Sequence, residues 1–146
     1  MSDVLPLAPI LLQVGDWAEL ASLAGPVRRD VFVREQGIAE ELEWDAMDAA
    51  CVHCVAFAGD LPVGTGRLLP DAHIGRMAVL ADFRHRRIGG MILDRLIDIG
   101  RARGDRCLRL NAQQYVTGFY RQRGFVEVGE PFMEAGIAHL AMRLDL

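Results

Sequence analysis

The sequence predicts an α/β fold: a single domain over residues 1–146 with a mixed, largely antiparallel sheet flanked by helices. Two strand–turn–strand segments follow one another between residues 52 and 80, which predicts an antiparallel meander. Apolar residues recur at helical spacing from Ile88 onward, which predicts a helix after the meander. A chain of 146 residues can bury roughly two thirds of the surface that it exposes when unfolded, enough for one core.

The N-terminal part is expected to hold one strand and two helices. The strand covers residues 10–15, and Asp16 is a suitable N-cap for a helix that begins near Trp17. Gly25-Pro26 predict an interruption of this helix, because proline removes a backbone hydrogen bond and clashes with the preceding turn. A second helix is then expected from Val27 to Glu35.

The later elements follow from apolar periodicity and turn chemistry. The acidic stretch 36–50 shows no clear period and is expected to be loop or partial helix. Turns are indicated at Gly59-Asp60-Leu61-Pro62 and at Pro70-Asp71. The elements expected beyond residue 50 are strands at 52–58, 63–69 and 74–80, a helix from Ile88 to the region of Gly100 and Gly104, a strand at 106–111, a short helix at 116–123, and strands at 125–128 and around 140–144.

Composition excludes several classes of function. A net charge of −4 disfavours non-specific binding to nucleic acid. No apolar run approaches the roughly 20 residues that a membrane-spanning helix needs. Met1 to Ile10 contain no Lys or Arg, so the basic start of a signal peptide is lacking. We therefore expect a cytoplasmic protein with no nucleic-acid or membrane partner, whose three cysteines are reduced thiols.

The basic run Arg84-His85-Arg86-Arg87, followed by Gly89-Gly90, is a candidate anion site. It lies between an expected strand and an expected helix, and a helix start offers free N–H groups and partial positive charge. Glycines let the backbone approach a phosphate, and arginines add forked donors, so a diphosphate could bind without a metal. The alternative is a solvated basic run in which the glycines only permit tight helix packing. Neither a Walker loop nor a dinucleotide-binding glycine pattern is present.

This loop resembles motif A of the GCN5-related N-acetyltransferases (the GNAT family), Arg/Gln-x-x-Gly-x-Gly/Ala, with Arg87 in place of the first glycine. Residues 113–125 are similar to the family's Asn-x-x-Ala-x-x-x-Tyr-x-x-x-Gly-Phe stretch, with Gln113 for Asn and Val116 for Ala. Four further segments resemble the ElaA-type subgroup: Val31–Gln36, Glu43-x-Asp45-x-x-Asp48-x-x-x-x-His53, Asn111-Ala112-Gln113 and Gly136-Ile137-Ala138-His139. The resemblance spans residues 27 to 144.

The resemblance implies acetyl transfer from acetyl-CoA to an amine of a small molecule or a peptide. The thioester would lie between two parted central strands, and Tyr120 would be the general acid that protonates the departing thiolate. A core tyrosine is the alternative reading of Tyr120. The residues that the resemblance assigns to acetyl-CoA are Met77, Ala78, Val79, Arg84, Arg86, Arg87, Ile88, Gly89, Gly90 and Gln113.

The general base is left open. The strand Ile74-Gly75-Arg76-Met77 carries no carboxylate where many relatives have one, so a non-catalytic acyl-CoA-binding sensor or interaction module remains a second hypothesis. Candidates for the base are Glu35, Glu43, His53 and His139, each of which could instead be structural; Glu35, His53 and His139 are expected at the substrate site. An acidic mouth formed by residues 40–48 would favour a cationic amine, unless that run is a solvated face.

Two further expectations concern metals and assembly. Cys51-Val52-His53-Cys54 has no second ligand pair at zinc-binding spacing, so both cysteines are expected to be small core residues and no metal site is expected. Val126, Phe132, Ile137 and the alternating apolar C-terminal strand offer a possible homodimer surface, or they simply close the sheet.

Overall fold

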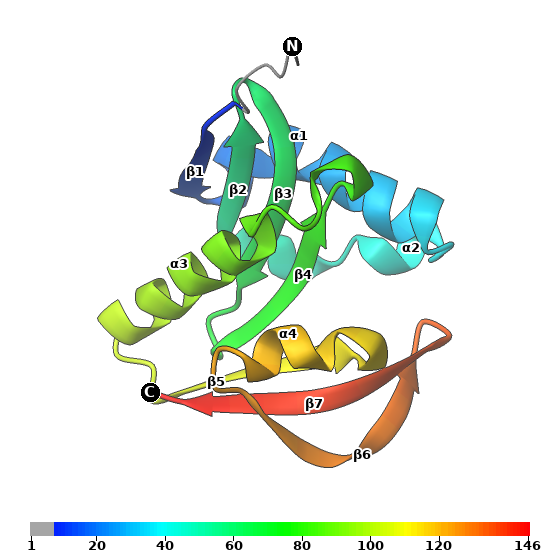
Figure 1. Ribbon diagram of the computed structural model, residues 1–146, viewed down its shortest axis with the longest axis vertical. Coiled ribbons are helices and arrows are strands. Elements are labelled where there is room, and N and C mark those ends of the chain that lie inside the picture. The colour runs from blue at the N-terminus through cyan, green and yellow to red at the C-terminus, as the bar shows by residue number, and fades with distance from the viewer. Residues whose placement is uncertain (1–7) are drawn as a thin grey trace, which may run out of the picture.

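The computed structural model describes residues 8–146, and its centre is a seven-stranded sheet of order β1-β2-β3-β4-β5-β7-β6 (Figure 1). The strands are β1 (Ile10–Gly15), β2 (Val52–Ala58), β3 (Leu61–Leu68), β4 (His73–Val79), β5 (Cys107–Gln113), β6 (Val126–Glu134) and β7 (Ile137–Asp145). Every neighbouring pair is antiparallel except β4 and β5, which are parallel. The mixed, largely antiparallel sheet expected from the sequence is therefore confirmed.

Helices cover both faces of the sheet. They are α1 (Trp17–Arg28), α2 (Glu40–Glu43), α3 (Ile88–Ala102) and α4 (Thr117–Arg121), with short 3-10 turns at Ala46–Ala50, Ala81–Phe83 and Gln114–Val116. Figure 1 shows α3 in front of β2, β3 and β4, and α1 behind them. The alternation along β2 fits this arrangement, because Cys54 and Ala56 pack in the cluster that contains α3 whereas Val55 packs with Leu20 of α1.

The expected interruption at Gly25-Pro26 is wrong. Helix α1 runs through Pro26 to Arg28 and continues as a π-helix from Arg29 to Glu35. Proline near the end of a helix removes one backbone hydrogen bond, and its fixed φ is itself helical. The chain then continues in wider π-turns, in which an N–H donates to the carbonyl five residues earlier. One example is the hydrogen bond of 3.1 Å from the Gln36 N–H to the Val31 carbonyl.

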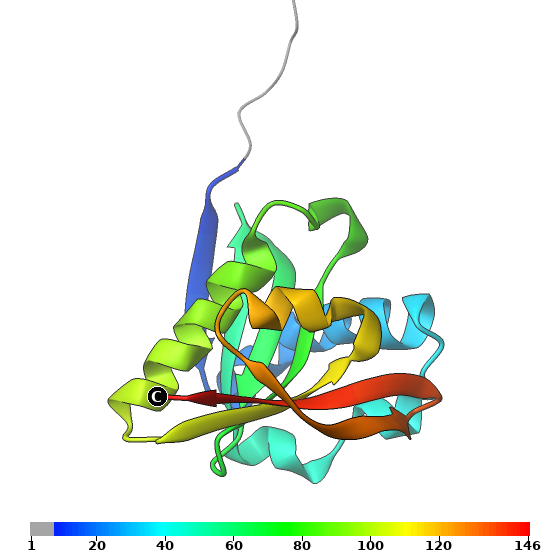
Figure 2. The same ribbon diagram turned by 60° about the horizontal axis from the view of Figure 1, so that its bottom comes forward.

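Several element boundaries also differ from the expected ones. β3 begins at Leu61, so Pro62 belongs to the strand and only Gly59-Asp60 form the turn. β6 extends to Glu134, beyond the expected end at residue 128. Its hairpin with β7 turns at Ala135 and Gly136, whose φ values of 52° and 76° are those of a tight two-residue hairpin turn. Figure 2 shows β6 and β7 as a long, twisted hairpin at one edge of the sheet.

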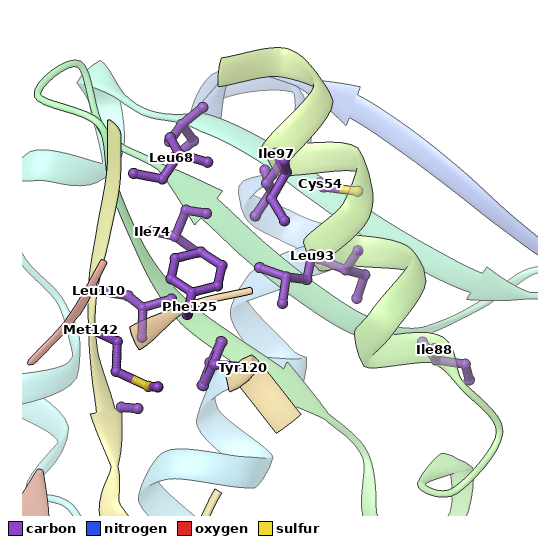
Figure 3. Packing of buried hydrophobic residues seen from close by; sticks show 14 of the residues in the cluster. Cys54, Leu68, Ile74, Ile88, Leu93, Ile97, Leu110, Tyr120, Phe125 and Met142 are labelled. Carbon is purple, nitrogen blue, oxygen red and sulfur yellow. The ribbon is translucent and has the colours of Figure 1, made fainter. Parts of the chain in front are cut away.

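Glycines in β3 let α3 approach the sheet closely. A Cβ at Gly64 would lie 2.9 Å from the Ile92 Cδ1 atom, and one at Gly66 would lie 2.5 Å from the Met77 sulfur. Figure 3 shows α3 side chains, among them Leu93 and Ile97, directed at the residues of the sheet in this cluster. Larger residues in β3 would therefore lift α3 from the sheet and displace its N-terminus.

A bulge in β4 lies just beyond the last residue that pairs with β5. The β3–β4 register shifts between Thr65 and Arg67, and Arg76 opposite this shift has a φ of 50°. β5 pairs with β4 only at His73↔Arg109 and Ile74↔Leu110. Both strands continue beyond these pairs, so the sheet opens in its middle (Figure 1).

Two other expectations concern the sequence ends and the cysteines. No helix within residues 8–146 is long and apolar enough to cross a membrane. The prediction that a signal peptide is lacking concerns residues 1–10, and residues 1–7 lie outside the described part of the chain. Cys51 and Cys54 are free thiols that are 4% and 0% exposed, which confirms them as buried residues.

Candidate active site

The opening between β4 and β5 exposes strand backbone that has no partner strand on that side within residues 8–146. Ala78 and Val79 pair with Thr65 and Gly64 of β3, but no pairing with β5 extends beyond Ile74. Strand backbone without a neighbour can hydrogen-bond an extended ligand as though the ligand were another strand. Met77, Ala78 and Val79 are therefore brought to the opening, as expected.

The basic loop connects β4 to the start of α3. The first N–H groups of an α-helix have no partner within the helix, and no side chain within residues 8–146 caps α3. His85 and Arg87 adopt left-handed conformations with φ values of 65° and 63°. Arg87, which stands where the resemblance has a glycine, thus keeps the conformation that glycine favours. The N–H groups of Ile88, Gly89 and Gly90 are left to an anion.

Arg84 is held in place by two neighbouring groups. Its guanidinium donates two hydrogen bonds of 2.6 Å to the Glu35 carboxylate, and its Nε donates to the Val79 carbonyl at 3.0 Å. The hydrogen bond from Arg84 lowers the pKa of Glu35. Arg86 instead lies over the ring of Phe83, with 5.1 Å between the guanidinium carbon and the ring centre. In this structure the Arg84 guanidinium is therefore occupied by Glu35 and by the Val79 carbonyl.

Arg123 is a further cation at this helix start, and the sequence analysis missed it. Its guanidinium fills the space that a Cβ at Gly90 would take. The same group lies 5.0 Å above the ring of Phe119, and its Nε is 3.3 Å from Asp94. The signal in the sequence was weak, because Arg123 lies 33 positions after Gly90 and only the packing of α4 brings it there.

Gly89 faces the space between β4 and α4. A Cβ built on Gly89 would point at the ring of Phe119, 3.4 Å away, and at Val79, 3.8 Å away. A branched side chain at this position would therefore enter the space directly beside the opening.

Tyr120 follows Phe119 in the sequence and is buried in the main core cluster. Its side chain is 8% exposed and makes edge-to-face contacts with Phe119 and Phe125, at 5.0 and 6.0 Å between ring centres. Figure 3 shows it in the same cluster as Phe125 and Leu110. Burial raises the pKa of Tyr120 to about 12, so the phenol keeps its proton at neutral pH and can donate it.

Residues 35 and 36 reach both sides of the opening. Glu35 binds Arg84 beyond β4, while the Gln36 side chain exchanges hydrogen bonds of 2.8 and 3.3 Å with Gln113 at the end of β5. The Tyr115 hydroxyl donates to the same Gln113 oxygen at 2.5 Å. The end of the π-helix thus ties the basic loop to β5, and Gln113 is oriented by two neighbours.

The four candidate bases fall into two groups. Glu35 and His139 lie beside the opening, Glu35 next to Arg84 and His139 opposite Gln113 in the β5–β7 register. His53 and Glu43 are 1% and 2% exposed and lie in a buried ionic cluster instead. His53 Nε2 is 2.9 Å from the Asp48 carbonyl, and burial lowers its pKa. The structure therefore does not bring His53 to the substrate side.

The buried ionic cluster joins the acidic stretch to the sheet, and sequence reasoning missed it. Arg28 donates to Glu43 at 2.7 Å and to Asp48 at 2.8 Å, while its guanidinium lies between Trp17 and Trp44. Asp48 also accepts a 2.8 Å hydrogen bond from Arg67 of β3, and Asp45 takes two more from the same guanidinium. This cluster fixes residues 43–48 against the face of the sheet that α1 covers.

No metal site is built into the described part of the chain. Within residues 8–146, no group of three or more His, Cys, Asp or Glu side chains is arranged to hold an ion.

Parted central strands beside an uncapped, basic helix start define an acyltransferase fold that binds acyl-CoA. The sequence profile of the acetyltransferase (GNAT) domain matches residues 30–146. The chain belongs to this family and is an ElaA-like acyltransferase, as the resemblance implied.

Individual relatives agree with this assignment. The uncharacterized N-acetyltransferase YjcF of Bacillus subtilis is 36% identical over 82% of this chain and 88% of its own length. Protein ElaA of Escherichia coli is 27% identical over 82% of this chain and 84% of its own length. A candidate N-acetyltransferase from Lactobacillus plantarum, solved as a crystal structure, superposes with a TM-score of 0.87 at 25% identity, covering 94% of this chain and 98% of that one.

Proposed function

We propose that residues 1–146 form one N-acetyltransferase domain that works in the cytoplasm and moves the acetyl group of acetyl-CoA to an amine of a small molecule or a peptide. The observation that carries this proposal is the packing of Tyr120, whose protonated side chain lies in one cluster with Leu110 and Ala112 of β5, the strand that borders the opening. A domain that only binds acyl-CoA has no need of a proton donor there.

Acetyl-CoA would bind across the opening through groups of different kinds. The pantetheine arm would pair with the backbone of Met77, Ala78 and Val79, whose β5-facing side has no partner strand. The pyrophosphate would meet the free amides at the start of α3, which follow Arg87. The positive charges around it would be supplied by Arg84, Arg86, Arg87 and Arg123, while Gln113 would line the β5 side.

Catalysis would rest on placing the thioester between the strands. There an amine attacks the carbonyl carbon, and backbone N–H groups of β4 can stabilise the negative charge that develops on the oxygen. As the carbon–sulfur bond breaks, the Tyr120 hydroxyl donates its proton to the thiolate.

A non-catalytic acyl-CoA sensor is the second candidate. The observation that favours it is the absence of any carboxylate on β4 between His73 and Val79, where many relatives have their base. The family assignment favours the enzyme, because this fold is that of an acyltransferase.

Two assays test the proposal together. Acetyl-CoA and CoA, but not a short oligonucleotide, should raise the melting temperature, because binding to the native state stabilises it by about 2.7 kcal/mol at a hundredfold excess over Kd. Thiol release is then followed with butylamine, phenethylamine, lysinamide and a short peptide with a free N-terminus as acceptors. Binding without thiol release on any amine would overturn the enzyme in favour of the sensor.

We also propose that the edge strand β6 mediates a homodimer. Val126, Val128, Phe132 and Met133 are 60%, 48%, 36% and 68% exposed, although their side chains are apolar. β6 is the last strand of the sheet (Figure 2), so one side of its backbone has no strand partner within residues 8–146. Sedimentation giving 16.1 kDa at micromolar concentration, rather than twice that mass, would reject the dimer.

A further inference from the structure

His139 lies on the opposite face of the sheet from Tyr120. It pairs with Gln113 of β5 and with Phe132 of β6, and directly paired residues share a face. Met142 lies three residues further along β7 and so points to the other face, where it packs in the same cluster as Tyr120. Since Gln113 ends β5 beside the opening, a thioester between the strands is reachable from His139 on one face and Tyr120 on the other.

The imidazole of His139 is fixed in one tautomer. Its Nδ1 lies 2.7 Å from the Ile137 carbonyl oxygen, which can only accept, so Nδ1 carries the hydrogen. Nε2 of the neutral ring therefore holds a free lone pair. The ring also stacks on Phe132, with 5.9 Å between the ring centres and 25° between their planes. The lone pair thus has a defined direction before any substrate binds.

The charges around His139 suit a group that must accept a proton. Glu134 of β6 places a carboxylate oxygen 3.5 Å from Nε2, which stabilises the imidazolium once it forms. On β5 the facing residue is the neutral Gln113, itself bound to the neutral side chains of Gln36 and Tyr115. Asn111 and Ala141 form the next pair on this face, and Arg109 and Arg143 form the pair beyond it.

We propose that His139 is the general base of the reaction and that Glu134 supports it. Nε2 takes one proton from the acceptor ammonium, and the freed nitrogen lone pair forms a bond to the thioester carbonyl carbon. The carbon–sulfur bond then breaks, and sulfur receives the Tyr120 proton. The nitrogen loses its second proton to the Tyr120 phenolate through water, while His139 releases its proton to solvent past Glu134. The products are the N-acetyl amide, the CoA thiol and one proton.

This assignment rests on the proposed function and explains why β4 needs no carboxylate. The base is a residue of β7 and lies on the face from which an amine can approach. CoA occupies the other face, which carries α3 and α4. Attack from one face and thiol departure on the other keep the first deprotonation of the amine apart from the protonation of sulfur.

The test replaces the imidazole and follows the rate against pH. With the panel amine that the wild type acetylates fastest, His139→Gln should lower kcat by about 10²–10⁴ near pH 7, the usual contribution of a general base. Acetyl-CoA affinity should change by less than about threefold, since the pyrophosphate and pantetheine contacts are untouched. The loss should shrink toward alkaline pH, because the acceptor is then already a free amine. His73→Gln, a histidine at the other end of the opening whose partner is Asp71, serves as the matched control.

Glu134→Gln gives a second, independent readout at a half-exposed residue. We expect a loss of about three- to tenfold near neutral pH, because the imidazolium formed in the reaction has lost its carboxylate partner. An unchanged rate for His139→Gln, a loss that is equal at every pH, or an unchanged rate for Glu134→Gln would overturn the assignment while leaving the acetyltransferase intact. Transfer to no amine by the wild type would overturn the proposed function and this assignment together.

Discussion

Replacing Tyr120 by Phe separates the packing of this residue from its chemistry. The ring contacts with Phe119 and Phe125 at 5.0 and 6.0 Å involve carbon atoms that phenylalanine retains. Burial is the one cause behind the raised pKa of Tyr120, so within residues 8–146 no hydrogen bond offsets the desolvation of its hydroxyl. The loss of about 1 kcal/mol expected when a buried hydrogen bond is removed therefore does not apply. Tyr120→Phe should be as stable as the wild type, or more stable by up to about 1 kcal/mol.

The effect on turnover should be far larger than the effect on stability. A positioned general acid contributes about 10²–10⁴ in rate, which corresponds to about 3–5 kcal/mol of transition-state stabilisation. Binding of acetyl-CoA should stay within about threefold, because the groups that hold the pyrophosphate and pantetheine do not involve this hydroxyl.

The measurement needs kcat, acetyl-CoA affinity and melting temperature from one preparation. Tyr120→Ala is the matched control, since it removes the ring as well and should cost about 3–5 kcal/mol of stability. A Tyr120→Phe enzyme with wild-type kcat on a verified amine would refute the assignment. Tyr120 would then be a core residue, and the proton donor would have to be another group or water.

Three further predictions address the loop and the cluster beneath α1. If Arg84 leaves Glu35 for the pyrophosphate, Glu35→Gln should tighten acetyl-CoA binding by about two- to fivefold in calorimetry, because an exposed ion pair is worth at most about 1 kcal/mol. Arg84→Ala should instead weaken acetyl-CoA binding by about 1–3 kcal/mol. Arg87→Gly should keep acetyl-CoA affinity and should not lower the melting temperature, because glycine adopts this φ of 63° without strain; a large loss of affinity would show that the side chain binds the ligand. Arg28→Leu should lower the free energy of unfolding in urea by about 3–5 kcal/mol, since the buried carboxylates of Glu43 and Asp48 each lose a hydrogen-bonded arginine. Arg29→Leu on the surface should cost at most about 1 kcal/mol.

Local sequence signals were sufficient for most of the fold. Alternating apolar residues and turn residues act within a few positions, so the meander and the helix from Ile88 were predicted with ends within about two or three residues. The helix interruption predicted at Pro26 is wrong, because a helix that ends in π-turns accommodates this proline. The length of β6 was also missed, since its extension to Glu134 depends on pairing with β7 rather than on its own pattern.

For the candidate site too, the sequence predicted residues of contiguous motifs but not contacts between distant segments. The basic loop and Tyr120 were found because each belongs to a contiguous motif. Arg123 at Gly90 and Gln36 at Gln113 were missed, because both contacts join segments that are far apart in the sequence and depend on how helices and strands pack. Nothing in a single sequence specifies such pairs before the topology is known.

The acidic stretch is the clearest case in which the three-dimensional structure changes the interpretation of the sequence. In the sequence, residues 40–48 suggested an acidic mouth that selects a cationic amine. In the folded protein Glu43 and Asp48 are 2% and 3% exposed and are bound by arginines, so their charge is neutralised and hidden from an approaching substrate.

The acidic stretch contributes instead to the shape of the site. Arg76, the strained residue of the β4 bulge with a φ of 50°, donates to the Glu43 carbonyl at 3.2 Å and lies 3.3 Å from Asp45. The acidic stretch therefore holds the bulge just beyond the point where β4 separates from β5. Selection of the acceptor by charge then depends on groups exposed beside the opening, among which Glu134 carries the negative charge next to His139. A preference for cationic amines should accordingly weaken in Glu134→Gln and persist in Asp45→Asn.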